Sequence, residues 1–245
     1  MAQEKFFDRP FVLPAILLSL GLFVSAVAVS YTFYAVRGLD DTLSVTGSAK
    51  QEVRADTAKW TVQIYRNAFE EGVTAAYGQV ARDTDTVKAY FKQAGIEEKN
   101  ITANTVAADQ DWSYNQNSGP KRYIVHQDIT IESSDVEKVQ ALSQNIGALV
   151  NKGVSITPQQ PQYYVSNLPE LRVSLLGQAV SDAKARANEI AKSGGNSVGK
   201  LKSASSGVVQ VLAPHATNVE DYGSYDTSTI DKEVMVTARV VFRIK

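Results

Sequence analysis

Few side chains in this sequence have the types and spacing that metal or acid–base chemistry requires. His126 and His215 are the only histidines, and no HxxxH or HExxH spacing occurs. The absence of cysteine excludes a disulfide framework, a thiol nucleophile and cysteine-based metal sites. We interpret His126 as a solvent-facing or core-edge residue of a strand rather than as a ligand.

Two aspartates offer a second candidate. Asp109 and Asp111 flank Gln110 immediately before a polar loop at residues 112–120. Carboxylates at this spacing could begin a cation site, but the glycine and the terminal glutamate of an EF-hand loop are missing. We therefore interpret the pair as the solvated end of a strand.

The segment Glu220–Asp226 (EDYGSYD) lies in a long loop at residues 213–231 and combines acidic with aromatic side chains. We interpret it as a surface loop. The functional alternative is a contact loop between subunits, because tyrosine is favoured at interfaces. No GxSxG elbow, GxGxxG or Walker loop occurs. The sequence thus predicts no catalytic residue, no cofactor and no metal site, and a hydrolytic enzyme has the least support.

The stretch Pro10–Val36 contains no charged residue and, as a helix, would be roughly 40 Å long, against about 30 Å for a hydrocarbon core. We predict a transmembrane anchor at 10–36, preceded by a cytoplasmic segment at 1–9 and followed by a linker at 37–42. The mixed charge before the stretch and the aromatics near its end favour a retained anchor. The alternative is a signal peptide cut after Ala28, which would release a secreted protein.

The Lys and Arg residues around this stretch predict its orientation. Lys5 and Arg9 precede it and Arg37 follows it, so the positive-inside rule places the N-terminus in the cytoplasm and the large domain in the periplasm. Net charge is -1 over 245 residues, and the four charged residues before the anchor cancel. A nearly neutral domain argues against broad nucleic-acid binding, which needs a basic face.

The soluble part, 43–245, alternates between strand and helix patterns. We expect strands at 43–49, 59–66, 101–111, 123–131, 154–165, 201–212 and 232–244. We expect helices at 69–93, from a capping box at Ser134–Glu137 to Leu149, and from 167 to the glycines at 194–195. The order ββαββ, α, βαββ predicts an α+β fold with mainly antiparallel sheet.

Helical periodicity predicts which positions of the two long helices are buried. The first has an inward face of Val73, Tyr77, Val80, Thr84, Val87, Phe91 and Ala94. The second has a stripe of Leu168, Leu171, Leu175, Ala179, Ala183, Ala187 and Ile190. Because alanine adds little thickness, this helix should lie close on a sheet. Within the strand at 43–49, Gly47 suggests a bulge or a turn.

A possible internal repeat relates the two halves of the domain. Tyr77-Gly78-Gln79 recurs as Leu176-Gly177-Gln178, Gly95 as Gly194, and Asp83 as Asp182, all 99 residues apart. These matches predict a duplicated β-α-β-β unit, with copies at about 43–132 and 154–245.

Three segments together resemble a known family. They are AVSDAKARANEIAKSGGNSVGKL (Ala179–Leu201), LSVTGSAKQEVRADTAKWTVQI near the start of the domain, and VMVTARVVFRI at its end. They resemble the SIMPL-domain family, which includes a bacterial periplasmic immunogenic protein and a protein linked to oxidative-stress defence. The resemblance covers about Leu43–Ile244.

The resemblance implies an α+β domain with an export signal or anchor, assembly into ring- or cage-like homo-oligomers, and no established catalytic residues. We therefore expect a non-enzymatic, single-pass protein of the bacterial inner membrane that self-assembles and is linked to envelope or oxidative-stress defence. Its expected partners are copies of itself and, through 10–36, the lipid bilayer, with no nucleic acid. The alternative is a periplasmic ligand- or cation-binding module using the loops 112–120 and 213–231.

Overall fold

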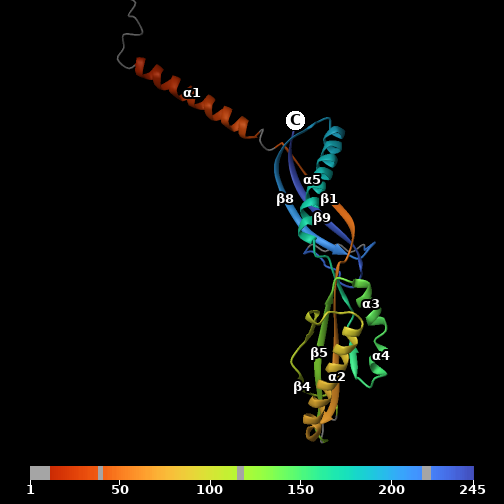
Figure 1. Cartoon of the computed structure of the whole chain (residues 1–245). Coiled ribbons are helices and arrows are strands. Elements are labelled where there is room, and N and C mark those ends of the chain that lie inside the picture. The colour runs from red at the N-terminus through yellow and green to blue at the C-terminus, as the bar shows by residue number, and fades with distance from the viewer. Residues whose placement is uncertain (1–11, 38–40, 115–118, 217–221) are drawn as a thin grey trace, which may run out of the picture. The chain divides into compact units, whose positions relative to one another are not determined.

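The computed structural model describes residues 12–37, 41–114, 119–216 and 222–245. The fold is α+β with mainly antiparallel sheets behind an N-terminal apolar helix, as predicted (Figure 1). The chain divides into two compact units, which we describe separately. Unit 1 comprises residues 1–48, 179–207 and 238–245, and unit 2 comprises 49–178 and 208–237.

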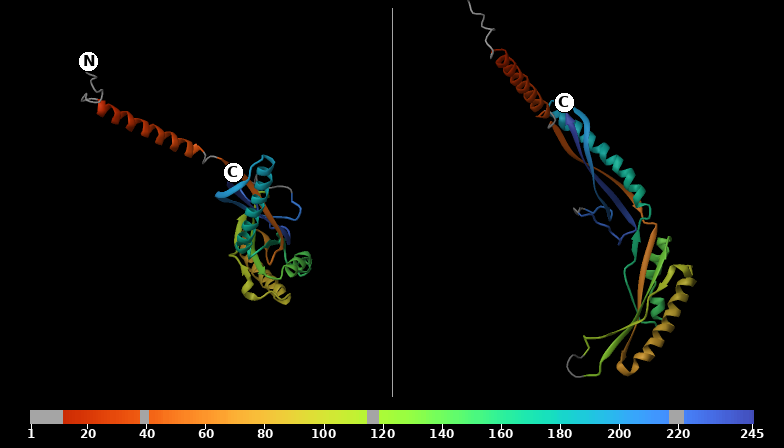
Figure 2. Two further views of the ribbon diagram at one scale, coloured as in Figure 1. Left: turned by 90° about the horizontal axis from the view of Figure 1, so that it is seen from above. Right: turned by 90° about the vertical axis from the view of Figure 1, so that its left-hand side faces the viewer.

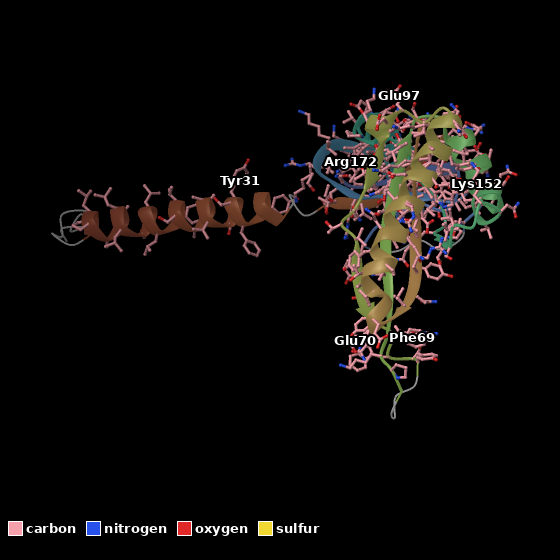
Figure 3. All side chains as sticks on the ribbon, turned by 60° about the horizontal axis from the view of Figure 1, so that its bottom comes forward. Tyr31, Phe69, Glu70, Glu97, Lys152 and Arg172 are labelled. Atoms are coloured by element: carbon pink, nitrogen blue, oxygen red, sulfur yellow. The ribbon has the colours of Figure 1, made fainter. Side chains whose placement is uncertain are left out.

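Helix α1 (Val12–Arg37) occupies the apolar stretch. Its segment Leu13–Tyr34 is 22 residues long, has a mean hydropathy of 2.2, and has none of its window buried by the rest of the protein. Tyr31, labelled in Figure 3, is 74% exposed on this helix. Length and composition suit a membrane-spanning anchor, and a signal sequence near an N-terminus shares both properties.

Unit 2 is built on a long pair of antiparallel strands. β2 (Thr57–Phe69) pairs with β5 (Arg122–Ser133) from Ala58↔Ser133 to Phe69↔Arg122. Four short strands extend this sheet: β3 (Ile101–Ala103) and β4 (Ala107–Gln110) lie on β5, and β6 (Ile156–Pro158) and β7 (Gln162–Tyr164) lie on β2. Helix α2 (Val73–Gln93), preceded by the short 3-10 turn η2 (Glu70–Gly72), runs along the sheet (Figure 2).

Alternation along β2 and β5 places the large apolar side chains of unit 2 against α2. The buried set from these three elements is Trp60, Val62, Ile64, Val125, Ile129, Ile131, Ala76, Val80, Val87 and Phe91. The Trp60 and Phe91 rings meet edge to face with centroids 5.7 Å apart. One predicted core position is wrong: Tyr77 is 39% exposed, and Ala76, one residue earlier on the helix, is buried instead.

The polar residue on the inward face of α2 contacts a polar residue of β5. Thr84 of α2 donates its hydroxyl to Gln127 Oε1 of β5 at 2.5 Å, and Gln127 Nε2 donates to the Asn104 carbonyl at 2.6 Å. Thr84 is 6% exposed. Each residue therefore satisfies a polar group that would be costly to bury alone.

Two predicted strands of unit 2 are divided. The strand expected at 101–111 forms β3 and β4, because three residues, 104–106, face only two on β5 between the pairs Ala103↔Ile129 and Ala107↔His126, which is a bulge. The strand expected at 154–165 forms the short edge strands β6 and β7 on either side of residues 159–161. Pro158 and Pro161 account for the break, because proline cannot donate to a ladder.

The expected capping box at Ser134–Glu137 is not formed. Helix α3 (Val136–Gln144) is capped by Asp135, whose carboxylate accepts the Lys138 N–H at 3.0 Å. This start is one residue later than predicted, so the Glu137 side chain does not reach back to the cap and pairs with Arg54 instead. A separate short helix, α4 (Gly147–Val150), follows α3.

The second sheet has the strand order β1-β9-β8, formed by β1 (Thr42–Arg54), β9 (Asp231–Ile244) and β8 (Val198–Leu212). β1 is thus longer than the predicted strand at 43–49. The alternation of β9 is confirmed, since Val234, Val236, Ala238, Val240 and Phe242 are all buried.

This strand order changes the assignment of segments in the predicted repeat. Residues 43–54 were expected in the first copy, but β1 joins β9 and β8, whereas β6 and β7 pair with β2. The repeat remains a prediction.

Helix α5 (Leu168–Ser193) buries Ala179, Ala183, Ala187 and Ala191. Ile190 was expected in this stripe but is 52% exposed, because the continuing four-residue step places Ala191 inward. In unit 1 the helix lies directly on β1 at Gly47. A Cβ at Gly47 would lie 2.1 Å from the Ala179 carbonyl oxygen and 2.4 Å from the Ala183 nitrogen. Gly47 therefore does not mark a turn. It is the point where the backbones of β1 and α5 touch.

Both long helices end in the same way. Gly95 has φ +84°, and the Ile96 N–H bonds the Phe91 carbonyl at 3.0 Å. At the end of α5 the residue with positive φ is Gly195, and the Asn196 N–H bonds the Ala191 carbonyl at 2.8 Å. These are Schellman caps. The structural counterpart of Gly95 is thus Gly195, not the predicted Gly194.

Candidate functional site

The structure pairs two residues that the sequence analysis weighed separately. His126 Nε2 on β5 lies 2.8 Å from Asp109 Oδ2 on the neighbouring strand β4. Asp109 is largely exposed, as a solvated strand end should be. Within the described parts of the chain, no group of three His, Cys, Asp or Glu side chains comes together as a metal site would require. His215 lies apart, after β8, with φ +62°.

Asp111 differs from the solvated strand end that we expected. Its side chain is only 8% exposed, and its carboxylate accepts the Ser113 hydroxyl at 2.5 Å and Arg122 Nε at 2.9 Å. Hydrogen bonds from Ser113 and Arg122 lower the pKa of the Asp111 carboxyl. Its lone pairs are occupied by neighbours, so this carboxylate fastens the start of the loop at 112–120 and does not present itself to a ligand.

Aromatic side chains surround this loop start. Phe69 and Tyr114 have ring centroids 5.7 Å apart, and the Arg122 guanidinium lies 4.1 Å from the Tyr114 ring centroid. Trp112 is 71% exposed. Figure 3 labels Phe69 and Glu70 at the end of β2, beside this loop. Residues 115–118 of the predicted binding loop lie outside the described residues.

The described part of the loop 213–231 is organised by Asp226. Its carboxylate accepts the Ser228 hydroxyl at 2.6 Å and bonds to Thr229, and Lys232 Nζ lies 3.5 Å from Oδ2. Burial by itself raises the pKa of the Asp226 carboxyl, but these hydrogen bonds and the lysine charge lower the pKa well below its usual range. Residues 217–221, with part of the acidic segment, lie outside the described residues.

Lys232 is the buried charge that the sequence analysis missed. Its side chain is fully buried, and Nζ also donates to the Asp226 carbonyl. Burial lowers the pKa of Lys232. The sequence did indicate this burial, because alternate residues of a strand lie on the same face. Lys232 therefore shares a face with the inward Val234 and Val236 of β9. Asp226 engages this ammonium group, so the Lys232 amine is not a free nucleophile. The pair stabilises the loop.

A polar groove borders the same loop. It has a volume of about 610 Å³ and is open to solvent on one side. Its polar lining includes Arg54, Gln140, Gln144, Gln160, Ser228 and Asp231. Amide, hydroxyl and charged groups of this kind could hydrogen-bond a small polar molecule.

The two edges of the β1-β9-β8 sheet differ sharply within unit 1. On β1, the Ser48 N–H donates to Asp182 Oδ2 of α5 at 2.8 Å, and Arg186 Nε lies 2.8 Å from the same oxygen. The Ser48 N–H and Arg186 lower the pKa of the Asp182 carboxyl. On the other edge, every residue of β8 from Lys200 to Ser206 is exposed. α5 thus binds one backbone N–H of the β1 edge strand, whereas the residues of this stretch of the β8 edge strand are exposed.

Comparison with known proteins supports the family that the sequence resembles. No curated protein matches this chain. A family model matches residues 43–244, which span both sheets, α2 and α5. The chain therefore belongs to the SIMPL family, described as a protein of unknown function (DUF541).

Proposed function

We propose that this SIMPL protein is a non-enzymatic, membrane-anchored protein of the bacterial envelope whose domain assembles with copies of itself. The observation that carries the proposal is the open edge of β8. A strand edge presents unpaired backbone N–H and C=O groups, and proteins usually shorten, cover or charge such an edge. β8 is an edge strand of the β1-β9-β8 sheet, and its residues from Lys200 to Ser206 are exposed.

The anchor favours assembly for a separate reason. α1 would hold every copy in the same membrane. The domains would then be confined to one plane with a common orientation, which raises their effective concentration. Weak edge contacts then suffice for assembly. If the segment is instead cut after Ala28, the same domain must assemble from free solution.

Orientation and retention can be measured directly. With the N-terminus in the cytoplasm, protease added to intact spheroplasts should digest the domain, because it faces the periplasm. Full protection until the membrane is permeabilised would reverse the orientation. N-terminal sequencing of the mature protein distinguishes the retained anchor from a chain that begins at Val29.

Self-assembly is tested by light scattering on the full chain in detergent. We expect a species larger than one chain at micromolar concentration, and a clean monomer would refute the proposal. A Ser203→Lys, Ser205→Lys variant should shift the distribution toward monomer, because it adds like charges to the open edge. Ser174→Lys, Gln178→Lys is the matched control, since both residues lie on exposed positions of α5.

The groove beside the loop 213–231 supports a second candidate, a periplasmic module for a small polar ligand or a cation. A thermal-shift screen of metal ions, sugars and amino acids tests it, because a ligand that binds the native state raises its stability by mass action. An Arg54→Ala variant should abolish any such shift. The link to oxidative-stress defence rests on the family resemblance, and peroxide survival of a deletion strain tests it.

A further inference from the structure

We propose that the groove beside the loop 213–231 binds a free α-amino acid with a neutral polar side chain, with its carboxylate on Arg54 and its ammonium group on Asp231. The inference rests on the second candidate function, a module for a small polar ligand, and names the class of that ligand. The groove has a volume of about 610 Å³, which is a common size for a small-molecule site. Its described lining residues all belong to unit 2.

The two charged residues of the groove occupy neighbouring positions. Arg54 is the last residue of β1 and Asp231 is the first residue of β9, and these strands are neighbours in their sheet. The Ala55 N–H donates to the Ile230 carbonyl at 2.9 Å, which fixes the two segments to each other at this point. A positive and a negative group placed side by side match an α-amino acid, whose carboxylate and ammonium groups are attached to one carbon atom.

Arg54 is engaged in a contact that a ligand can replace. Its guanidinium pairs with Glu137 of α3, and both side chains are more than half exposed. An exposed ion pair contributes little to stability, because water and salt screen it. A ligand carboxylate can form two parallel N–H···O bonds with a guanidinium, so it can displace Glu137 at small cost. Glu137 is therefore a competitor of the ligand, and its removal should strengthen binding.

Backbone and carboxylate hydrogen bonds fix one wall of the groove. Tyr163, which lines the groove and is only 4% exposed, donates its N–H to the Thr227 carbonyl at 2.8 Å. The Asp226 carboxylate accepts the N–H groups of Ser228 at 3.1 Å and of Thr229 at 3.2 Å. Because these bonds already hold the loop segment, a ligand need not order it, and less entropy is lost on binding.

The rest of the lining favours a neutral polar side chain on the ligand. The glutamines Gln140, Gln144 and Gln160 are exposed, and their amides can both donate and accept hydrogen bonds. Among the described lining residues, Arg54 and Asp231 are the only charged ones. A sugar would use neither charge, and Arg54 would repel a metal ion. An amino acid uses both charges and leaves its side chain to the glutamine amides.

Isothermal titration calorimetry on the full chain in detergent tests the ligand class. The probes are L-serine, L-threonine, L-asparagine and L-glutamine. The tightest-binding probe is then compared with its N-acetyl derivative, which lacks the ammonium group, and with its amide, which lacks the carboxylate. We expect each derivative to bind about tenfold more weakly or worse, because each loses a hydrogen bond between charged groups.

Variants of the chain assign each end of the ligand to its residue. Asp231→Asn should weaken binding of the amino acid about tenfold but leave the N-acetyl derivative unchanged, because that derivative has no ammonium group to lose. Arg54→Gln should act in the same way toward the amide. Glu137→Gln should strengthen binding about two- to fivefold by releasing Arg54. Glu132→Gln, at an exposed position of β5 outside the groove, is the matched control and should change nothing.

The outcomes separate this inference from the second candidate function. If all four amino acids fail while a sugar or a metal ion binds and Arg54→Ala abolishes that binding, the inference is overturned and the groove remains a ligand site. Equal binding of the amino acid and its two derivatives also overturns it, as does binding that neither Asp231→Asn nor Arg54→Gln weakens. If no amino acid, sugar or metal ion binds, both the inference and the second candidate function are refuted.

Discussion

Replacing Gly47 with alanine should separate α5 from β1. The added Cβ would lie 2.1 Å from the Ala179 carbonyl oxygen, 2.4 Å from the Ala183 nitrogen and 2.8 Å from the Ala183 Cα. All three atoms belong to backbone, so no side-chain rotation relieves the overlap. Restoring an ordinary contact requires a relative movement of about 1.3 Å between the strand and the helix.

The cost has two parts. Overpacking of this kind typically costs about 1–3 kcal/mol. The same movement would stretch the 2.8 Å bond from the Ser48 N–H to Asp182 beyond hydrogen-bond range, and a bond to a charged group contributes about 1.5–3 kcal/mol. We expect a loss of about 3–5 kcal/mol in the free energy of unfolding, a large share of the stability of a typical domain.

Urea unfolding followed by circular dichroism, together with hydrogen exchange of the peptides containing Ser48 and Ala183, measures this effect. Exchange should accelerate in both peptides. Gly78→Ala is the matched control: it is an interior position of α2 whose Cβ would meet only the Arg82 side chain at 3.7 Å, so this change should stabilise by about 0.5–1 kcal/mol. A Gly47→Ala protein as stable as the wild type would show that the helix does not lie on the strand as described.

The remaining predictions concern buried polar contacts. Because the pKa of Asp226 is lowered in the folded state, its carboxylate stabilises the fold above about pH 4 and this stabilisation is lost as the pH falls below that value. Asp226→Asn should therefore weaken the fall in urea midpoint between pH 5 and pH 3, and an unchanged fall would contradict the assigned contacts. Thr84→Val should cost about 1–3 kcal/mol by leaving Gln127 Oε1 without its donor, whereas Thr84→Val with Gln127→Leu should cost less than the sum of the single changes. Strict additivity in that double-mutant cycle would show that the two side chains do not interact.

Local patterns predicted most of the burial correctly. The alternation of β2 and β9 and the four-three spacing of α2 depend on residues close in sequence, and a strand or helix turns at a fixed angle per residue. The errors at Tyr77 and Ile190 each concern the edge of a helical face, where a neighbouring alanine fits the available space better. The apolar helix α1 was recognisable because its segment is long and uncharged, as a hydrocarbon core requires.

What local patterns could not predict were the contacts between distant segments. Gly47 suggested a turn because nothing nearby reveals the helix that touches it more than 130 residues later. Periodicity placed Thr84 on an apolar helical face, and only its contact with Gln127 explains a threonine there. Local patterns also could not predict the difference between the two edge strands of the β1-β9-β8 sheet. This difference depends on the contact of Asp182 with Ser48, 134 residues earlier in the chain.

The position of β9 has a consequence for how the protein is made. β9 is the middle strand of its sheet, yet it is the last to be synthesised, about 180 residues after β1. At synthesis rates of about 5–20 residues per second, β1 waits on the order of ten seconds or longer for its partner. During that time β1 and the newly made β8 both lack β9, the strand that lies between them. A chain stalled or cut short before residue 231 therefore exposes two unpaired strands at once. Synthesis of β9 is therefore the step that gives both strands the partner between them.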